Sequence, residues 1–193
     1  MNGVEITVAI TLAKGETLAL ELNGQTITGT DNETKSYGLI NINPGAELTI
    51  NDATTGNGAI KLTATINREW NAYSSVISNQ RGKLTVNGGT IEHLGGTDMA
   101  YAIDNLTNGK GTKAETIING GTVKSTYRAI RQFLNGTEAQ NILTVNGGTI
   151  EGTNKSIWMQ DASKNSNTGN LTVAADAKLT GDVYLSVTAG STE

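Results

Sequence analysis

One nine-residue segment recurs at three places in this chain. Residues 84–92 read Leu-Thr-Val-Asn-Gly-Gly-Thr-Ile-Glu, and residues 143–151 repeat that string. Residues 116–124 give a third version, Thr-Ile-Ile-Asn-Gly-Gly-Thr-Val-Lys. A unit that recurs every few tens of residues is typical of stacked-repeat proteins. The repeat therefore constrains the fold more than any other feature of the sequence.

Fainter copies of the unit emerge when the Asn-Gly pair is taken as its reference position. They lie near residues 20–27, 48–51 and 171–174, which brings the number of units to six. Successive corner positions are 28, 36, 32, 27 and 28 residues apart. Solenoids have periods of roughly 20–50 residues. The six corner positions are Asn23, Asn51, Asn87, Asn119, Asn146 and Ala174.

Apolar and polar residues alternate within each unit, which indicates strands rather than helices. One strand precedes the corner, a second follows it, and a third completes the unit. Three short strands per unit, with no helical pattern, predict an all-β fold: a right-handed parallel β-helix of about six coils. Each coil then pairs its backbone with the coils above and below it. The third strands are residues 38–40, 75–77, 101–103, 128–130, 156–158 and 183–185.

An Asn-Gly pair between two strands is also a strong hairpin signal, so a series of hairpins is the alternative fold. Six copies in register, each followed by a third strand, favour the coil. Aligned corners would place Asn51, Asn87, Asn119 and Asn146 in one column. We expect their amides to hydrogen-bond along the stack as a structural ladder. A ligand site at these asparagines is the alternative.

The composition argues against several classes of function. The 193 residues include no cysteine, so neither a disulfide framework nor a thiolate metal site is possible. A net charge of −4 without a basic cluster argues against nucleic-acid binding. No apolar run approaches the roughly 20 residues that span a bilayer, so membrane insertion is not expected. The acidic loops 30–33, 51–53 and 160–163 lack a regular run of oxygen ligands. We therefore expect no metal and no cofactor.

We expect a single β-helix domain over residues 1–193. Residues 1–14 form its N-terminal cap strand, and residues 15–193 form the repeat coils. No signal peptide is present, and the core strand 183–187 stops without an atypical capping unit. We interpret the chain as a piece excised from a longer exported protein. An uncapped parallel edge would also favour end-to-end self-association.

The segments 15–29 and 43–52, followed by Asn-Gly-Gly-Thr-Ile repeats, resemble the right-handed β-helix repeat regions of bacterial surface and secreted proteins. Those regions belong to the pectate-lyase-like superfamily, and the resemblance covers most of the chain. It implies a location outside the cell or on the bacterial surface. The group includes adhesins, pectate-lyase-like domains and stalks, so the resemblance implies a setting rather than an activity.

All five tyrosines lie in or just before a third strand, and both tryptophans belong to the same side. Rings repeated along an outer face would form a platform for stacking sugars or for docking a protein. Charged residues from adjacent coils lie beside them. The candidate ligand-binding residues are Tyr37, Trp70, Tyr73, Tyr101, Asp104, Tyr127, Arg128, Arg131 and Trp158. The alternatives are that the rings fill the core and that Asp104 and Arg131 form only a surface ion pair.

The leading hypothesis is a non-catalytic, adhesin-like interaction module that binds a glycan or a host surface protein through this aromatic flank. A passive spacer is the second hypothesis, and a polysaccharide lyase or hydrolase is the third. Glycoside hydrolysis needs two positioned carboxyl groups, and only Asp104 and Asp161 lie near the third strands. The single histidine, His93, is expected at a solvated edge.

Overall fold

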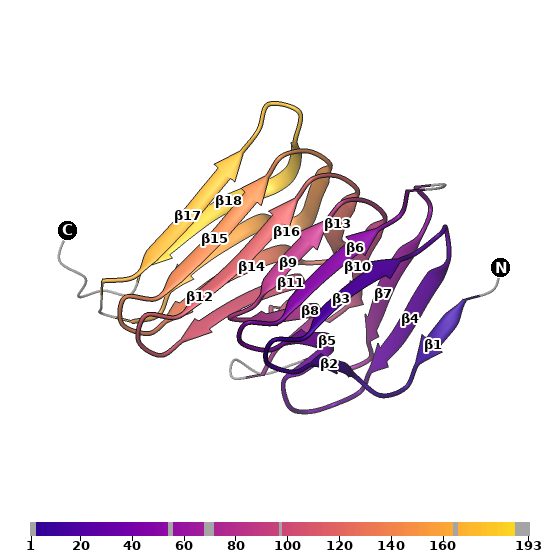
Figure 1. The fold of residues 1–193 in the computed structure, drawn as a ribbon, viewed down its shortest axis with the longest axis horizontal. Helices are drawn as coiled ribbons and strands as arrows, with labels where there is room; N and C mark the ends of the chain where they lie inside the picture. The colour runs from indigo at the N-terminus through magenta and orange to yellow at the C-terminus, as the bar shows by residue number, and fades with distance from the viewer. Residues whose placement is uncertain (1–2, 54–55, 68–71, 97, 164–165, 188–193) are drawn as a thin grey trace.

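The computed structural model describes residues 3–53, 56–67, 72–96, 98–163 and 166–187. All regular structure within these residues is β, and the strands stack as a parallel β-solenoid of about six turns (Figure 1). Strands β1 and β18 lie at opposite ends of the stack. In this part of the chain no helix is long and apolar enough to cross a membrane.

The solenoid has three faces, which the chain visits in the same order in every coil. Face 1 contains β3 (Thr17–Glu21), β6 (Glu47–Asn51), β9 (Lys83–Val86), β12 (Lys113–Ile118), β15 (Gln140–Val145) and β17 (Thr168–Val173). Face 2 contains β1 (Val4–Ile6), β4 (Thr26–Asp31), β7 (Ala59–Ala64), β10 (Thr90–Gly95) and β13 (Thr122–Ser125). Face 3 contains β2 (Ile10–Leu12), β5 (Tyr37–Ile42), β8 (Ser74–Gln80), β11 (Ala100–Asn108) and β14 (Arg128–Asn135).

The last two coils join faces 2 and 3 in single long strands. β16 (Thr149–Asp161) pairs with β13 at its start and with β14 at its end, and β18 (Lys178–Val187) follows β16 along both halves. We number the coils from the face 1 strand that opens each, so coil 1 begins at β3 and coil 6 at β17. The N-terminal segment 4–12 forms β1 and β2, which pair in register with β4 and β5 of coil 1.

The predicted parallel β-helix of about six coils is confirmed; three short strands form each of the first four coils, and the last two coils have two strands each. The hairpin alternative is wrong, because adjacent strands in the stack pair in parallel on all three faces. Inward-facing aliphatic residues occupy the same register position in successive coils. On face 2 this column contains Ile60, Ile91, Val123 and Ile150, each without solvent exposure. Full burial of one such side chain stabilises the fold by about 1.5–3 kcal/mol.

The asparagine ladder is also confirmed. Asn87 Nδ2 donates to Asn51 Oδ1, Asn119 Nδ2 to Asn87 Oδ1, and Asn146 Nδ2 to Asn119 Oδ1, each at 2.8 Å. Asn23 is not part of this column, because Glu21 is the residue in register with Asn51. The ladder therefore begins at coil 2.

The left-handed residue of the corner is the second glycine of each Asn-Gly-Gly sequence. Gly121 has a φ of 81°. A Cβ atom there would lie 2.3 Å from the carbonyl oxygen of Gly89 in the coil below. Both the backbone conformation and the close approach of the next coil therefore require glycine at this position.

An alternating column of charges runs along the outside of face 2. Glu92 lies between Lys61 and Lys124 of the adjacent coils, with Nζ–O distances of 2.9 and 2.8 Å. Burial by itself raises the pKa of Glu92, but the hydrogen bonds from Lys124 and Lys61 outweigh it and hold the pKa below its usual 4.5. These ion pairs join three coils through their side chains.

Candidate functional site

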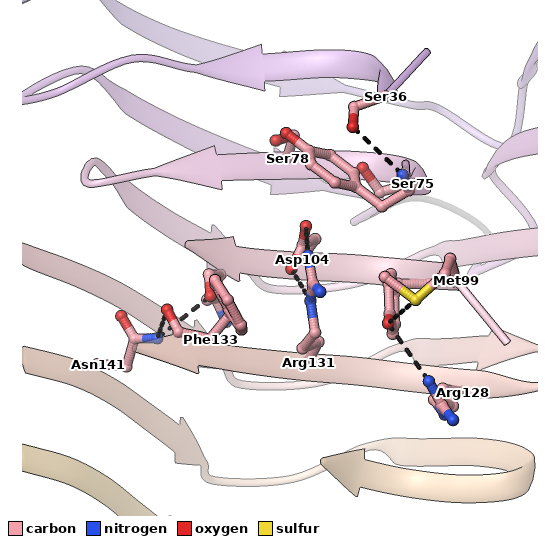
Figure 2. Close-up of polar contacts among 12 residues, drawn as sticks. Ser36, Ser75, Ser78, Met99, Asp104, Arg128, Arg131, Phe133 and Asn141 are labelled. Atoms are coloured by element: carbon pink, nitrogen blue, oxygen red, sulfur yellow. Dashed lines mark hydrogen bonds and ion pairs between the residues drawn. The ribbon is translucent and has the colours of Figure 1, made fainter. Parts of the chain in front are cut away.

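The candidate residues come together on the outside of face 3, because parallel pairing stacks equivalent positions of successive coils. One outward column runs through Asn41, Ser78, Asp104, Arg131, Trp158 and Tyr184. The side chains in it change from small and polar, through charged, to aromatic. The central coils of the solenoid therefore carry a cluster of charges and rings (Figure 2).

Asp104 and Arg131 form a bidentate ion pair between β11 and β14. Arg131 Nε donates to Asp104 Oδ1 and Arg131 Nη2 to Asp104 Oδ2, both at 2.7 Å. The prediction that these residues project outward from adjacent coils is correct. The alternative of a surface ion pair is wrong, since Asp104 is 0% and Arg131 4% exposed. The pair is covered by aromatic side chains.

Three rings enclose the Arg131 guanidinium. Its central carbon lies 4.5 Å from the ring centre of Tyr101, 4.8 Å from that of Phe133 and 5.4 Å from that of Tyr73. Burial by itself lowers the pKa of Arg131, but the Asp104 carboxylate more than offsets this and raises it. The guanidinium therefore stays charged and is held by one anion and three ring faces.

Tyr101 is fully buried, so it offers no open stacking surface. Its hydroxyl contacts the Met99 sulfur at 3.6 Å and accepts from Arg128 Nη1 at 3.4 Å (Figure 2). Trp158 is 6% exposed, and the Arg128 guanidinium lies 4.1 Å from its ring centre. Arg128 also donates to the backbone oxygen of Asp98. The interior of the cluster is thus closed by its own contacts.

Tyr127 in coil 4 and Tyr184 in coil 6 are rings of the flank that keep solvent exposure and do not pack on Arg131. Tyr127 is half-buried beside Arg128, at 4.9 Å from ring centre to guanidinium. Tyr184 is 49% exposed, and Lys155 Nζ lies 5.1 Å from its ring centre. We call Tyr127, Lys155 and Tyr184 the upper strip. A hydrogen bond to the Asp98 carboxylate, followed by burial, raises the pKa of Tyr127.

The remaining predicted residues differ in position. Tyr73 is half-buried over Arg131, and burial followed by the Asp104 carboxylate raises its pKa. Tyr37 is half-buried in coil 1, on β5, which is separated from β11 by β8, so it lies apart from the cluster. Trp70 lies outside the described residues. Phe133 and Tyr184, which are not among the candidate ligand-binding residues predicted from the sequence, belong to the same flank.

The two acids near the third strands are engaged in structural contacts. Both oxygens of Asp104 bind Arg131. Asp161 Oδ1 accepts hydrogen bonds from Ser163 N, Ser163 Oγ and Asn167 Nδ2, each at 3.0 Å, and so organises the loop after β16. In the described part of the chain, no group of three or more His, Cys, Asp or Glu side chains is placed to hold a metal ion.

The prediction that His93 is a solvated edge residue is wrong. His93 is fully buried, in register between Leu62 and Ser125 on face 2. Its Nε2 lies 2.8 Å from Ser74 Oγ, which donates to Asp31 Oδ2 at 2.5 Å. Because the single Ser74 proton goes to the carboxylate, the proton between Ser74 and His93 sits on Nε2. Period-two alternation after the inward Ile91 already places His93 inward.

Two hollows open at the corner between faces 3 and 1. One, of about 190 Å³, lies at the C-terminal coils and is lined by residues that include Met159, Asp161 and Leu185. The other, of about 270 Å³, lies at coils 1 to 4. Its charged lining consists of Glu47, Arg81, Lys83, Lys113 and Glu115. The rings around Arg131 line neither hollow.

Comparison with known proteins gave no match: no family model fits the chain, and neither a curated protein nor a solved structure is significantly similar to it.

Proposed function

We propose that this chain is a non-catalytic interaction module of a bacterial surface or secreted protein, related to the β-helix repeat regions of the pectate-lyase-like superfamily. It binds a glycan through the upper strip of face 3. The observation that carries this proposal is the exposure of Tyr184, with Lys155 Nζ 5.1 Å from its ring centre. The backbone of Lys155 is in turn hydrogen-bonded to the backbone oxygen of Tyr127. A ring supplies a stacking face for sugar C–H groups, and a neighbouring cation supplies hydrogen-bond donors.

The buried cluster supports this surface from below. Trp158 is in register with Tyr184, and Arg128 is in register with Lys155. Stacked side chains that are locked by packing restrict the motion of the layer above them, which lowers the entropy cost of binding. In this proposal Tyr101, Asp104, Arg128, Arg131 and Trp158 position the strip and do not contact the ligand.

A glycan array tests the proposal. We expect the wild type to bind a defined set of glycans and the double variant Tyr127→Ala/Tyr184→Ala to lose that binding. The control is Tyr37→Ala, which removes a half-buried tyrosine from the opposite end of the same face. Equal binding by the double variant and wild type would refute the strip as the site. Binding to no glycan by wild type would refute the glycan ligand, and a host-protein screen would then follow.

A rigid spacer is the second candidate, and a different observation favours it. Side-chain contacts join successive coils on all three faces, through the asparagine ladder, the Glu92 ion pairs and the Asp104–Arg131 pair. Such contacts resist separation of the coils, as a stalk requires. Pulling single molecules from their two ends tests this. A spacer should extend coil by coil only at high force, whereas easy extension would refute this candidate.

A further inference from the structure

The hollow at coils 1 to 4 is a charged recess that the proposed function does not use. It has a volume of about 270 Å³ and lies where the chain passes from face 3 to face 1. Three cations and two carboxylates line it, which leaves one net positive charge in a chain whose net charge is −4. An excess of cations around a recess attracts anions. The five charged residues are Arg81, Lys83, Lys113, Glu47 and Glu115.

Arg81 has a backbone conformation that arginine rarely adopts. It lies in the two-residue turn between β8 and β9, and its φ is 69°. The corresponding turns of the coils on either side have glycine in this left-handed region, at Gly45 and Gly111. Glycine enters the region freely, whereas the Cβ atom of arginine makes it unfavourable. Residues strained in this way cluster at ligand-binding and active sites, so the Arg81 side chain is the feature to explain.

The hydrogen-bonding groups of the Arg81 side chain are only partly satisfied. Its Nη1 donates to the backbone oxygen of Asn108, in the next coil, at 3.3 Å. Its Nε is buried and has no hydrogen-bond partner among the described residues. Within this part of the chain no ion pair joins Arg81 to a carboxylate. Because a buried donor without an acceptor is destabilising, an acceptor that enters the hollow beside Arg81 is favoured.

The two lysines of the lining differ in their pairing. Lys113 is paired with Glu115, at 3.0 Å between Nζ and Oε2. Lys83 lies in register between Glu47 and Glu115 on face 1. In the described ranges of the chain it forms an ion pair with neither of them. Arg81 and Lys83 are therefore the cations of the lining that an external anion can bind without displacing a carboxylate.

The charges of the lining favour one kind of anion. A guanidinium and a neighbouring ammonium bind a carboxylate well, because the planar arginine fork can donate two parallel hydrogen bonds to it. Glu47 and Glu115 repel a second negative charge on the ligand, which disfavours phosphate and sulfate. Their oxygens also accept hydrogen bonds, so a hydroxyl or ammonium group beside the ligand carboxylate finds a partner. The hollow is smaller than the roughly 300–1,000 Å³ of drug-sized pockets, so the ligand is small.

We propose that this hollow binds a small monocarboxylate that carries a hydrogen-bond donor on the adjacent carbon, as an α-hydroxy acid or an α-amino acid does. Arg81 and Lys83 hold the carboxylate, and Glu47 accepts a hydrogen bond from the neighbouring donor group. The binding of such a ligand does not depend on glycan binding by the upper strip, because the hollow and the strip share no residue. Failure of either proposal therefore leaves the other standing.

Titration followed by NMR of the backbone amides tests the proposal on the intact chain. Sodium lactate, L-alanine and inorganic phosphate are added in separate experiments at neutral pH and constant ionic strength, and the amide signals of Gly45, Gly82 and Lys83 are followed. We expect lactate or alanine to shift these signals to saturation, and phosphate to bind at least about tenfold more weakly. Saturation by lactate alone assigns a hydroxyl beside the carboxylate, and saturation by alanine alone assigns an ammonium. No saturable shift with either compound, or equal binding of phosphate, would overturn the proposal.

The variant Arg81→Gly separates binding from folding. Glycine adopts a φ of 69° without strain, so the melting temperature of this variant should equal or exceed that of the wild type. Its affinity for the carboxylate ligand should nevertheless fall at least about tenfold, because a charge-assisted hydrogen bond corresponds to a decade or more. The control Lys178→Ala removes an exposed cation from β18 in coil 6 and should leave the affinity unchanged. Unchanged affinity in Arg81→Gly, or an equal loss in Lys178→Ala, would overturn the assignment of Arg81.

A second variant tests the role of the acids without altering the turn. Glu47→Gln removes one of the two carboxylates of the lining and keeps the size of the side chain. Relative to lactate, phosphate should bind this variant more tightly than it binds the wild type, because one source of repulsion is gone. An unchanged ratio of the two affinities would overturn the selectivity that we propose, whatever the stability of Arg81→Gly.

Discussion

Replacing Asp104 with asparagine removes the carboxylate that binds Arg131. The guanidinium would remain 4% exposed among three rings, with two of its donors facing a neutral amide. Breaking a buried ion pair by removing one partner costs about 3–5 kcal/mol, because an uncompensated charge stays buried. Asp104→Asn should therefore lower the free energy of unfolding by about 3–5 kcal/mol.

Urea unfolding at neutral pH measures this, followed by Trp fluorescence and circular dichroism in parallel. Trp158 packs within the cluster, with its ring centre 6.5 Å from that of Tyr101, so fluorescence reports on the region. A slope of about 1–3 kcal/mol per molar urea converts the expected loss into a midpoint shift of roughly 1–5 M. Both probes must agree, because repeat proteins can unfold in parts.

The matched control is Lys113→Ala, which removes an exposed ion pair with Glu115 of 3.0 Å. Such a pair contributes about 0–1 kcal/mol and is screened by salt. The double variant Asp104→Leu/Arg131→Met should be less destabilised than the sum of its single variants, since no charge is left unpaired. A cost below about 1 kcal/mol for Asp104→Asn, or strict additivity in the double variant, would refute the reasoning.

Three further predictions concern other contacts. Gly121→Ala should lower the free energy of unfolding by at least about 3 kcal/mol, because its Cβ would clash with the coil below. Gly111→Ala has open space around it and should lower the free energy by about 1 kcal/mol, through its positive φ alone. Equal melting temperatures of the two variants would refute the steric argument. Because the pKa of Glu92 is lower in the folded protein than its usual 4.5, the ionised carboxylate stabilises the fold above pH 4.5, and this stabilisation is lost as pH falls through the folded pKa. Thermal melts between neutral and acidic pH should therefore show a melting temperature that depends less on pH in Glu92→Gln. Asn119→Asp removes one hydrogen-bond donor of the ladder and should lower the free energy of unfolding by about 1–3 kcal/mol. Chemical denaturation measures this, and an unchanged free energy of unfolding would show that the ladder does not stabilise the fold.

Most of the fold could be predicted from the repeat. Period-two alternation around a recurring corner identified the strands, and six copies with a third strand distinguished coils from hairpins. The column of Asn51, Asn87, Asn119 and Asn146 followed directly, because equal spacing from the corner places equivalent residues above one another. The first unit was misaligned at Asn23, because an Asn-Gly pair marks a turn but not its register.

The candidate site could be predicted only in part. The sequence identified which side chains share the outer flank of face 3, and Asp104 and Arg131 do meet there. His93 was placed wrongly although the same alternation points it into the core. Phe133 was missed as a partner of Arg131, because neither its distance from the guanidinium nor its orientation is encoded in spacing.

What the sequence by itself determined is which residues point outward and which coils they join, since both follow from a local period and a repeated length. Only the tertiary structure decided which outward residues reach solvent. Tyr101 and Tyr184 both belong to the outer flank, yet Tyr101 is fully buried and Tyr184 is 49% exposed. The difference arises because Trp158, Arg128 and Arg131 of neighbouring coils pack against Tyr101, whereas Tyr184 lies in the last described coil. Exposure is a property of those neighbours, and no single repeat contains them.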